Sequence, residues 1–96
     1  MAVHNATPQE ESATLRDLVQ VLIDGGVLNW GQGYALVSRL DVIDRQLADR
    51  DIEASAGLFQ TFINQAQEFV SAGILTVAQG DPLIDDAQNA IDQLNI

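Results

Sequence analysis

Four residues early in the chain combine aromatic rings with amide groups. Trp30 and Tyr34 are four residues apart, and Asn29 and Gln32 lie beside them. Side chains four residues apart share one face of a helix, and aromatic rings with a polar partner are enriched in binding interfaces. The group therefore indicates a binding site for a sugar or a protein surface. The alternative, which we expect to apply, is that Trp30 plugs one end of the fold, as Val77 would at a related position.

A second group consists of carboxylates. Four aspartates fall close together, at Asp41, Asp44, Asp49 and Asp51. Calcium loops supply several oxygen ligands from a compact D-x-D-x-D-G type of spacing, and that spacing does not occur here. An EF-hand is therefore excluded. We expect a solvated acidic face whose charges pair with Arg45 and Arg50, with weak surface binding of cations as the alternative.

The remaining polar residues do not have the pattern of a catalytic centre. Asp85 and Asp86 are adjacent, and adjacent helical residues point about 100° apart, so the two carboxylates do not converge on one substrate. His4 is the only histidine and lies in a stretch without periodicity, where no partner is held beside it as general acid–base catalysis requires. The chain has no cysteine. We predict that the protein is not an enzyme and holds neither a cofactor nor a metal.

The charge balance narrows the classes of partner. The 96 residues include 14 acidic residues and four basic ones, all arginine, and the formal net charge is −10. Such a charge opposes binding to nucleic acid or to anionic lipid. No segment has the roughly 20 apolar residues of a membrane span, so we expect no membrane insertion. The acidic surface suits a high-salt environment, and a GC-rich genome that replaces lysine by arginine explains it equally well.

One stretch of the chain occurs twice without a gap, at 25–47 and again 47 residues later at 72–94. Seven positions are identical: Gly26/Gly73, Leu28/Leu75, Gln32/Gln79, Gly33/Gly80, Leu36/Leu83, Gln46/Gln93 and Leu47/Leu94. Repetition at a fixed offset is the signature of a structural unit that is used more than once.

Each copy is predicted to end one helix and begin the next. Gly26 and Gly73 follow apolar-periodic runs, where the residue after a helix takes a positive φ that glycine tolerates. A capping residue and a glutamine then follow at spacings of three: Asn29 with Gln32, and Thr76 with Gln79. This is the pattern of a capping box, so we interpret both glutamines as caps. Glycine in the first turn of each following helix indicates close approach to a neighbouring helix.

Apolar spacing predicts four amphipathic helices, at about 8–24, 30–48, 52–71 and 77–94. The third contains all three phenylalanines, so we expect it at the centre of the core. On the first, Arg16, Asp17 and Gln20 are expected to face solvent.

The short connections between these helices imply an all-α fold, an antiparallel up-and-down bundle. In this interpretation the bundle consists of two repeated helical hairpins with pseudo-two-fold symmetry. We predict that 1–6 is a flexible tail or linker end and that 7–96 is a single domain.

The pattern G-[VI]-L-x-x-x-Q-G-x-x-L-[VI] occurs at 26–37 and at 73–84, around the run FINQAQEFV, and the stretch 61–75 that contains this run reads TFINQAQEFVSAGIL. Over residues 15–94 this arrangement resembles the FIMAH-type domain, a small helical module near the C-termini of bacterial and archaeal secreted hydrolases and surface proteins. Asp81-Pro82 and Leu40-Asp41-Val42 depart from the family's usual pattern. The resemblance implies a non-catalytic accessory role in an exported multidomain protein, without assigning a ligand.

We therefore expect an accessory or interaction module, secreted or on the cell surface, that contacts a glycan, a protein or the other domains of its parent polypeptide. The first fifteen residues lack the basic start and apolar run of a secretion signal, so an export signal would lie elsewhere in the parent chain. The alternative is a self-association module, in which hairpins pair across a partly apolar face of the alanine-rich segment 77–94.

Overall fold

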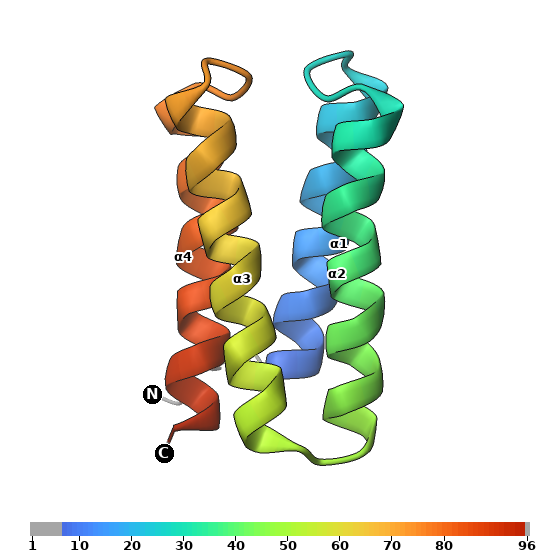
Figure 1. Cartoon of the computed structure of the whole chain (residues 1–96), viewed down its shortest axis with the longest axis vertical. Coiled ribbons are helices and arrows are strands. Elements are labelled where there is room, and N and C mark those ends of the chain that lie inside the picture. Colours follow the sequence, from blue (N-terminus) through green and yellow to red (C-terminus); the bar gives the residue numbers. More distant parts are fainter. Residues whose placement is uncertain (1–6, 96) are drawn as a thin grey trace, which may run out of the picture.

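Four α-helices make up most of residues 7–95, which are the residues that the computed structural model describes (Figure 1). They are α1 (Pro8–Asp24), α2 (Trp30–Ala48), α3 (Ile52–Ser71) and α4 (Val77–Leu94). No strand is present among these residues. The predicted helical fold and the bounds of its four helices are confirmed, and the predicted tail at 1–6 lies outside the described residues.

The helices form a closed ring in which each packs against two others: α1 with α2, α2 with α3, α3 with α4, and α4 with α1. The loops that join α1 to α2 and α3 to α4 lie at one end, uppermost in Figure 1, and the α2–α3 loop lies at the opposite end. The radius of gyration is 13.0 Å, which is the value of a compact domain of about 100 residues.

The core lies between the inward faces of the four helices, because residues spaced by three and four positions share one side of a helix. Phe59 and Phe62 of α3 are its two largest fully buried side chains, as the position of the phenylalanines predicts. The other large apolar side chains that are fully buried are Leu15, Val19, Leu28, Leu36, Leu40, Ile43 and Leu83.

The two repeated turns have the same backbone conformation. Gly26 and Gly73 both have a φ of 76°, in the left-handed region where a residue with a Cβ is strained. After each glycine, a backbone amide donates at 2.9 Å to the carbonyl five residues earlier, Val27 to Leu22 and Ile74 to Phe69. This is the long hydrogen bond of a Schellman ending. The predicted helix stops are therefore confirmed.

The turn between α2 and α3 reaches the same geometry without glycine. Arg50 has a φ of 59°, and the amide of Asp51 donates to the carbonyl of Gln46 at 2.9 Å. The Asp51 side chain then accepts from the backbone amide of Ala54 at 3.0 Å. Asp51 therefore caps α3, and Arg50 takes the left-handed conformation although it carries a side chain.

Two glycines allow neighbouring helices to approach closely, as predicted. A Cβ on Gly33 of α2 would overlap Cγ1 and Cδ1 of Ile23 on α1, and a Cβ on Gly80 of α4 would overlap Cγ2 of Val70 on α3. Gly33 and Gly80 are 47 residues apart, and so are their neighbours Ile23 and Val70. The same close contact therefore occurs once in each half of the chain.

Candidate functional site

The aromatic pair on α2 is held out in solvent. Trp30 is the first residue of α2 and is 79% exposed, and Tyr34, one turn later, is 68% exposed. The prediction that Trp30 plugs the end of the bundle is therefore wrong, and Val77, 63% exposed at the start of α4, is no plug either. Leu28 and Leu75 are the buried residues near these helix starts. They precede the caps, and a leucine there can pack onto the first turn.

The two amide side chains of the predicted site are engaged in capping α2. The Asn29 side-chain oxygen accepts from the backbone amide of Gln32 at 2.8 Å, and the Gln32 side-chain oxygen accepts from the backbone amide of Asn29 at 3.0 Å. The interpretation of Gln32 and Gln79 as capping residues is confirmed, because Gln79 forms the same reciprocal pair with Thr76. The capping fixes the start of α2, and with it the positions of Trp30 and Tyr34.

The structure therefore places all four predicted residues at one end of α2, but in two different roles. Asn29 and Gln32 order the backbone through their oxygens, which leaves their amide nitrogens as donors. Trp30 and Tyr34 offer aromatic surface to solvent. A separate open depression lies on α3 and α3's C-cap, lined by Asn64, Gln67, Glu68, Ser71 and Ala72. It borders on none of the four residues and is formed by one helix end alone, so it does not change the choice of site.

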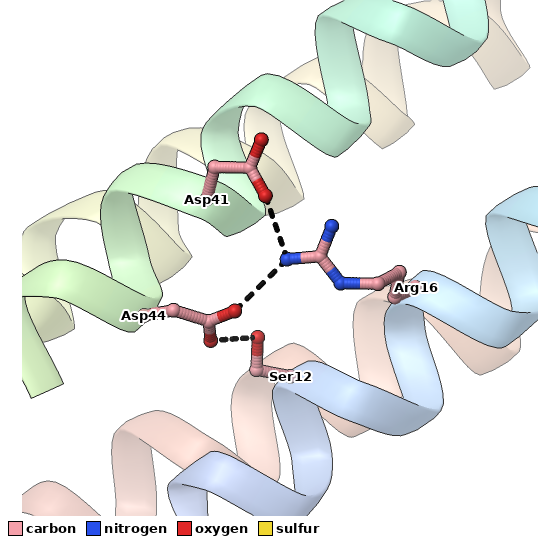
Figure 2. Close-up of polar contacts among 4 residues, drawn as sticks. All are labelled: Ser12, Arg16, Asp41 and Asp44. Carbon is pink, nitrogen blue, oxygen red and sulfur yellow. Dashed lines mark hydrogen bonds and ion pairs between the residues drawn. The ribbon is translucent and has the colours of Figure 1, made fainter. Parts of the chain in front are cut away.

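A polar cluster that the sequence pattern did not reveal joins α1 to α2 (Figure 2). Ser12 donates a hydrogen bond to Asp44 Oδ1 at 2.6 Å. Arg16 Nη2 lies 2.9 Å from Asp44 Oδ2 and 2.9 Å from Asp41 Oδ1. We call these four residues the α1–α2 clip. The clip connects two helices through one guanidinium group that both aspartates share, as Figure 2 shows.

The clip corrects two expectations about charge. Arg16 does not simply face solvent, because its guanidinium turns towards α2. Asp41 and Asp44 pair with Arg16, and among the described residues neither forms an ion pair with Arg45 or Arg50. Burial lowers the pKa of Arg16, but its hydrogen bonds to the two aspartates outweigh that effect and raise the pKa above its ordinary value. The clip is thus a charged interhelical contact.

The clip does not have the chemistry of a catalytic centre. Ser12 is only 1% exposed, so its hydroxyl is closed to a substrate. Its hydrogen-bond acceptor, the Asp44 carboxylate, is at the same time ion-paired with Arg16. We therefore assign the clip to the packing of α1 on α2.

His4 and Asp51, which were also considered for chemistry, add no further site to the described residues. His4 lies outside the described residues, and Asp51 is committed to its cap. Within residues 7–95, no group of three or more histidines, cysteines and acids is arranged to hold a metal ion. No described helix is both long and apolar enough to cross a membrane.

Comparisons of the chain with models of protein families, with curated proteins and with solved structures find no match. The resemblance to the FIMAH-type domain therefore stays a prediction that depends on the repeated pattern and on segment 61–75.

Proposed function

We propose that this chain is a non-catalytic binding module whose contact surface is the exposed face of Trp30 and Tyr34 at the start of α2. The observation that carries the proposal is the exposure of both rings, 79% and 68%, on a helix start whose backbone is fixed by reciprocal capping. Holding two large aromatic side chains in water gives up the stabilisation that their burial would provide. Large exposed aromatic surface on a rigid element is typical of interfaces.

The area of this surface favours a compact ligand. A Trp or Tyr side chain buries about 150–250 Å² on full contact, so the exposed parts of this pair, 79% and 68%, offer roughly 220–370 Å². A standard protein interface buries about 800 Å² on each partner. A sugar ring stacked on one aromatic face, with the amide nitrogens of Asn29 and Gln32 as donors, fits the smaller area. The proposed ligand is therefore a carbohydrate, and a limited contact on a protein surface is the second form of the same function.

Self-association is the alternative function. In the sequence, the alanine content of α4 supports self-association. In the structure, Ala87 and Ala90 are fully buried inside the bundle. They are not available to a second copy. The large apolar residue of α4 that is exposed is Val77, its first residue, and Val21, Val42 and Ile52 lie singly on the other three helices. A dimer would therefore depend on the same Trp30 and Tyr34 surface that we assign to a ligand.

The proposed architecture is a duplicated helical hairpin, arranged as an antiparallel up-and-down bundle with pseudo-two-fold symmetry. It is supported by the matching φ of Gly26 and Gly73 and by the position of both repeated turns at one end (Figure 1). We further propose that the module accompanies other domains of an exported or surface polypeptide. That part depends on the resemblance to the FIMAH-type domain and on the acidic composition.

The single tryptophan of the chain makes a direct test of the binding surface simple. The whole chain is titrated with soluble hexasaccharides of β-linked glucose, xylose, galactose and N-acetylglucosamine, while Trp30 fluorescence and the indole N–H signal are recorded. Binding through this surface shifts both signals for at least one sugar. In Trp30→Ala, sugar-induced changes in the remaining backbone amide signals disappear. Its helical circular dichroism stays unchanged, because exposed substitutions change stability by only about 0.5 kcal/mol or less.

Val77→Ala is the matched control, because Val77 is also exposed and lies 47 residues after Trp30. It should bind like the unmodified chain. If no sugar moves the Trp30 signals at millimolar concentration, the carbohydrate proposal fails. If those signals instead change with protein concentration alone, and sedimentation shows a dimer that Trp30→Ala abolishes, the self-association function replaces it.

A further inference from the structure

The ring of helices has one seam without a covalent connection. Short loops join α1 to α2, α2 to α3 and α3 to α4, and the contact between α4 and α1 closes the ring. No short loop therefore holds α1 next to α4. If the three contacts between loop-connected helices stay intact, only α1 and α4 can separate from each other in a local opening.

A buried carboxylate lies on the α1 side of the seam. Glu11 is only 7% exposed, and its Oε2 atom is buried without a hydrogen-bond partner. Burying a charged oxygen without compensation is costly. Burial is the largest cause that raises the pKa of Glu11, followed by the charges of Asp86 on α4 and Glu10. Glu11 is thus a carboxylate whose charge the closed seam disfavours.

A second carboxylate on α4 adds to this effect. Burial, and next the charge of Asp85, raise the pKa of Asp86. The charge of Asp86 in turn contributes to the raised pKa of Glu11. The two side chains belong to the two helices that meet at the seam, so their negative charges oppose its closure.

No basic side chain compensates these charges within the two helices. Residues 77–94 contain no lysine, arginine or histidine, and Arg16 is the only basic residue of α1. Arg16 is bound to Asp41 and Asp44 on the α2 side. The corresponding seam between α2 and α3 is different, since Arg39 of α2 donates to Gln65 of α3 at 3.4 Å.

A comparison of positions 47 residues apart shows how the two seams differ. Arg39 occupies the position that corresponds to Asp86, and Leu58 occupies the position that corresponds to Glu11. Where the α2–α3 seam has an arginine and a leucine, the α4–α1 seam has two acids. The acids are therefore a specific feature of the seam that has no loop.

We propose that Glu11 and Asp86 make the α1–α4 contact an acid-strengthened latch, which closes firmly in mild acid and opens more readily at neutral pH. Burial, which opening of the seam would relieve, is the largest cause that raises both pKa values, so between the ordinary and the raised values the closed seam binds more protons than the open seam does. Closure is therefore fully favoured below the ordinary values of 4.5 for Glu11 and 3.8 for Asp86. It weakens as the pH rises through the raised values.

Native-state hydrogen exchange of the whole chain tests the latch. Protection factors, corrected for the intrinsic rate at each pH, are measured between pH 4.5 and 7. Protection of α1 and α4 amides is expected to fall as the pH rises, by about tenfold for each unit that a pKa is raised. Amides at the α2–α3 contact should change less. In Glu11→Gln, the α1 and α4 amides should keep at pH 7 most of the protection that the unmodified chain shows at pH 4.5.

The control is Glu68→Gln, which removes the same charge from an exposed position on α3. It should retain the pH dependence of the unmodified chain. Asp86→Asn provides a second variant on the other side of the seam and should also reduce the dependence. The proposal is overturned if Glu11→Gln and Glu68→Gln behave alike, or if all four helices lose protection equally, because the effect would then be global unfolding.

Discussion

The α1–α2 half and the α3–α4 half of this chain share a turn but not a way of packing. Positions 47 residues apart differ in kind: Ser12 with Phe59, Arg16 with Ile63, and Asp44 with Ile91. In the first half these positions form the α1–α2 clip, whose hydrogen bonds and ion pairs are 2.6–2.9 Å long. In the second half they are apolar, and Phe59 is fully buried. Similar turns can therefore be followed by directional polar contacts or by apolar burial.

The second half compensates for its large aromatic residues with small partners. At three corresponding positions the first half has larger aliphatic residues and the second half has alanine: Val19/Ala66, Leu40/Ala87 and Ile43/Ala90. All six are buried. The small side chains allow α4 to approach α3, and these two helices have the most extensive contact in the bundle. Tight packing of this kind makes stability sensitive to the loss of volume.

The largest predicted effect tests this difference between the halves. Phe59→Ala should lower the free energy of unfolding by about 3–5 kcal/mol, because it removes a fully buried ring and leaves a cavity. Its counterpart Ser12→Ala should cost only about 1 kcal/mol, because Asp44 can then be solvated. Urea denaturation followed by circular dichroism measures both losses, provided that the unfolding free energy depends on urea concentration with the same slope in both variants. An equal loss in the two variants would contradict the conclusion that the second half depends on apolar burial where the first half depends on polar contacts.

A smaller effect is predicted for the two glycines at the close helix contacts. Gly33→Ala and Gly80→Ala each add a Cβ that overlaps a β-branched neighbour, Ile23 or Val70. Overpacking costs about 1–3 kcal/mol, and the gain in helix propensity from glycine to alanine returns about 1 kcal/mol. We expect a net loss of up to about 2 kcal/mol in each.

Double-mutant cycles show whether the overlap is the cause of that loss. Shortening the neighbour, with Ile23→Ala for Gly33→Ala and Val70→Ala for Gly80→Ala, should remove part of the penalty in both halves. Strictly additive losses in either cycle would mean that the glycine acts through its backbone rather than through the close contact.

The α1–α2 clip is predicted to contribute less than a core ring. Asp44→Ala leaves the buried Ser12 hydroxyl without its acceptor, which costs about 1–2 kcal/mol. Arg16→Ala should cost about 1 kcal/mol or less, because the Arg16, Asp41 and Asp44 side chains are 36%, 55% and 46% exposed and water screens the charges. Asp44→Asn keeps an acceptor for Ser12, so denaturation should rank it between these two variants. A loss in Arg16→Ala that exceeds the loss in Asp44→Ala would contradict this order.

The elements of the fold were predictable because their signals are local. Caps such as Thr76 with Gln79, and stops such as Gly73, depend on residues within one turn, and the helix bounds followed from them. The clip was missed because it depends on the register between α1 and α2, which brings together residues about 30 positions apart. The exposure of Trp30 was misjudged for a different reason, because the cap shows where α2 begins but not in which direction the side chain of its first residue points.

The smallest predicted effect concerns the turn that lacks glycine. Arg50 has the left-handed φ that Gly26 and Gly73 adopt in the repeated turns, and a side chain there costs about 1–2 kcal/mol. Arg50→Gly removes that strain, but the more flexible unfolded chain offsets about 0.4–1 kcal/mol of the gain. We expect a net stabilisation of about 0.5 kcal/mol by urea denaturation. Gly73→Ala introduces the same strain, and the less flexible unfolded chain offsets the same part of it, so we expect a net destabilisation of about 0.5 kcal/mol. If Arg50→Gly were instead destabilised, its side chain would have to make a stabilising contact that outweighs the strain, and the two kinds of turn would differ in more than their choice of residue.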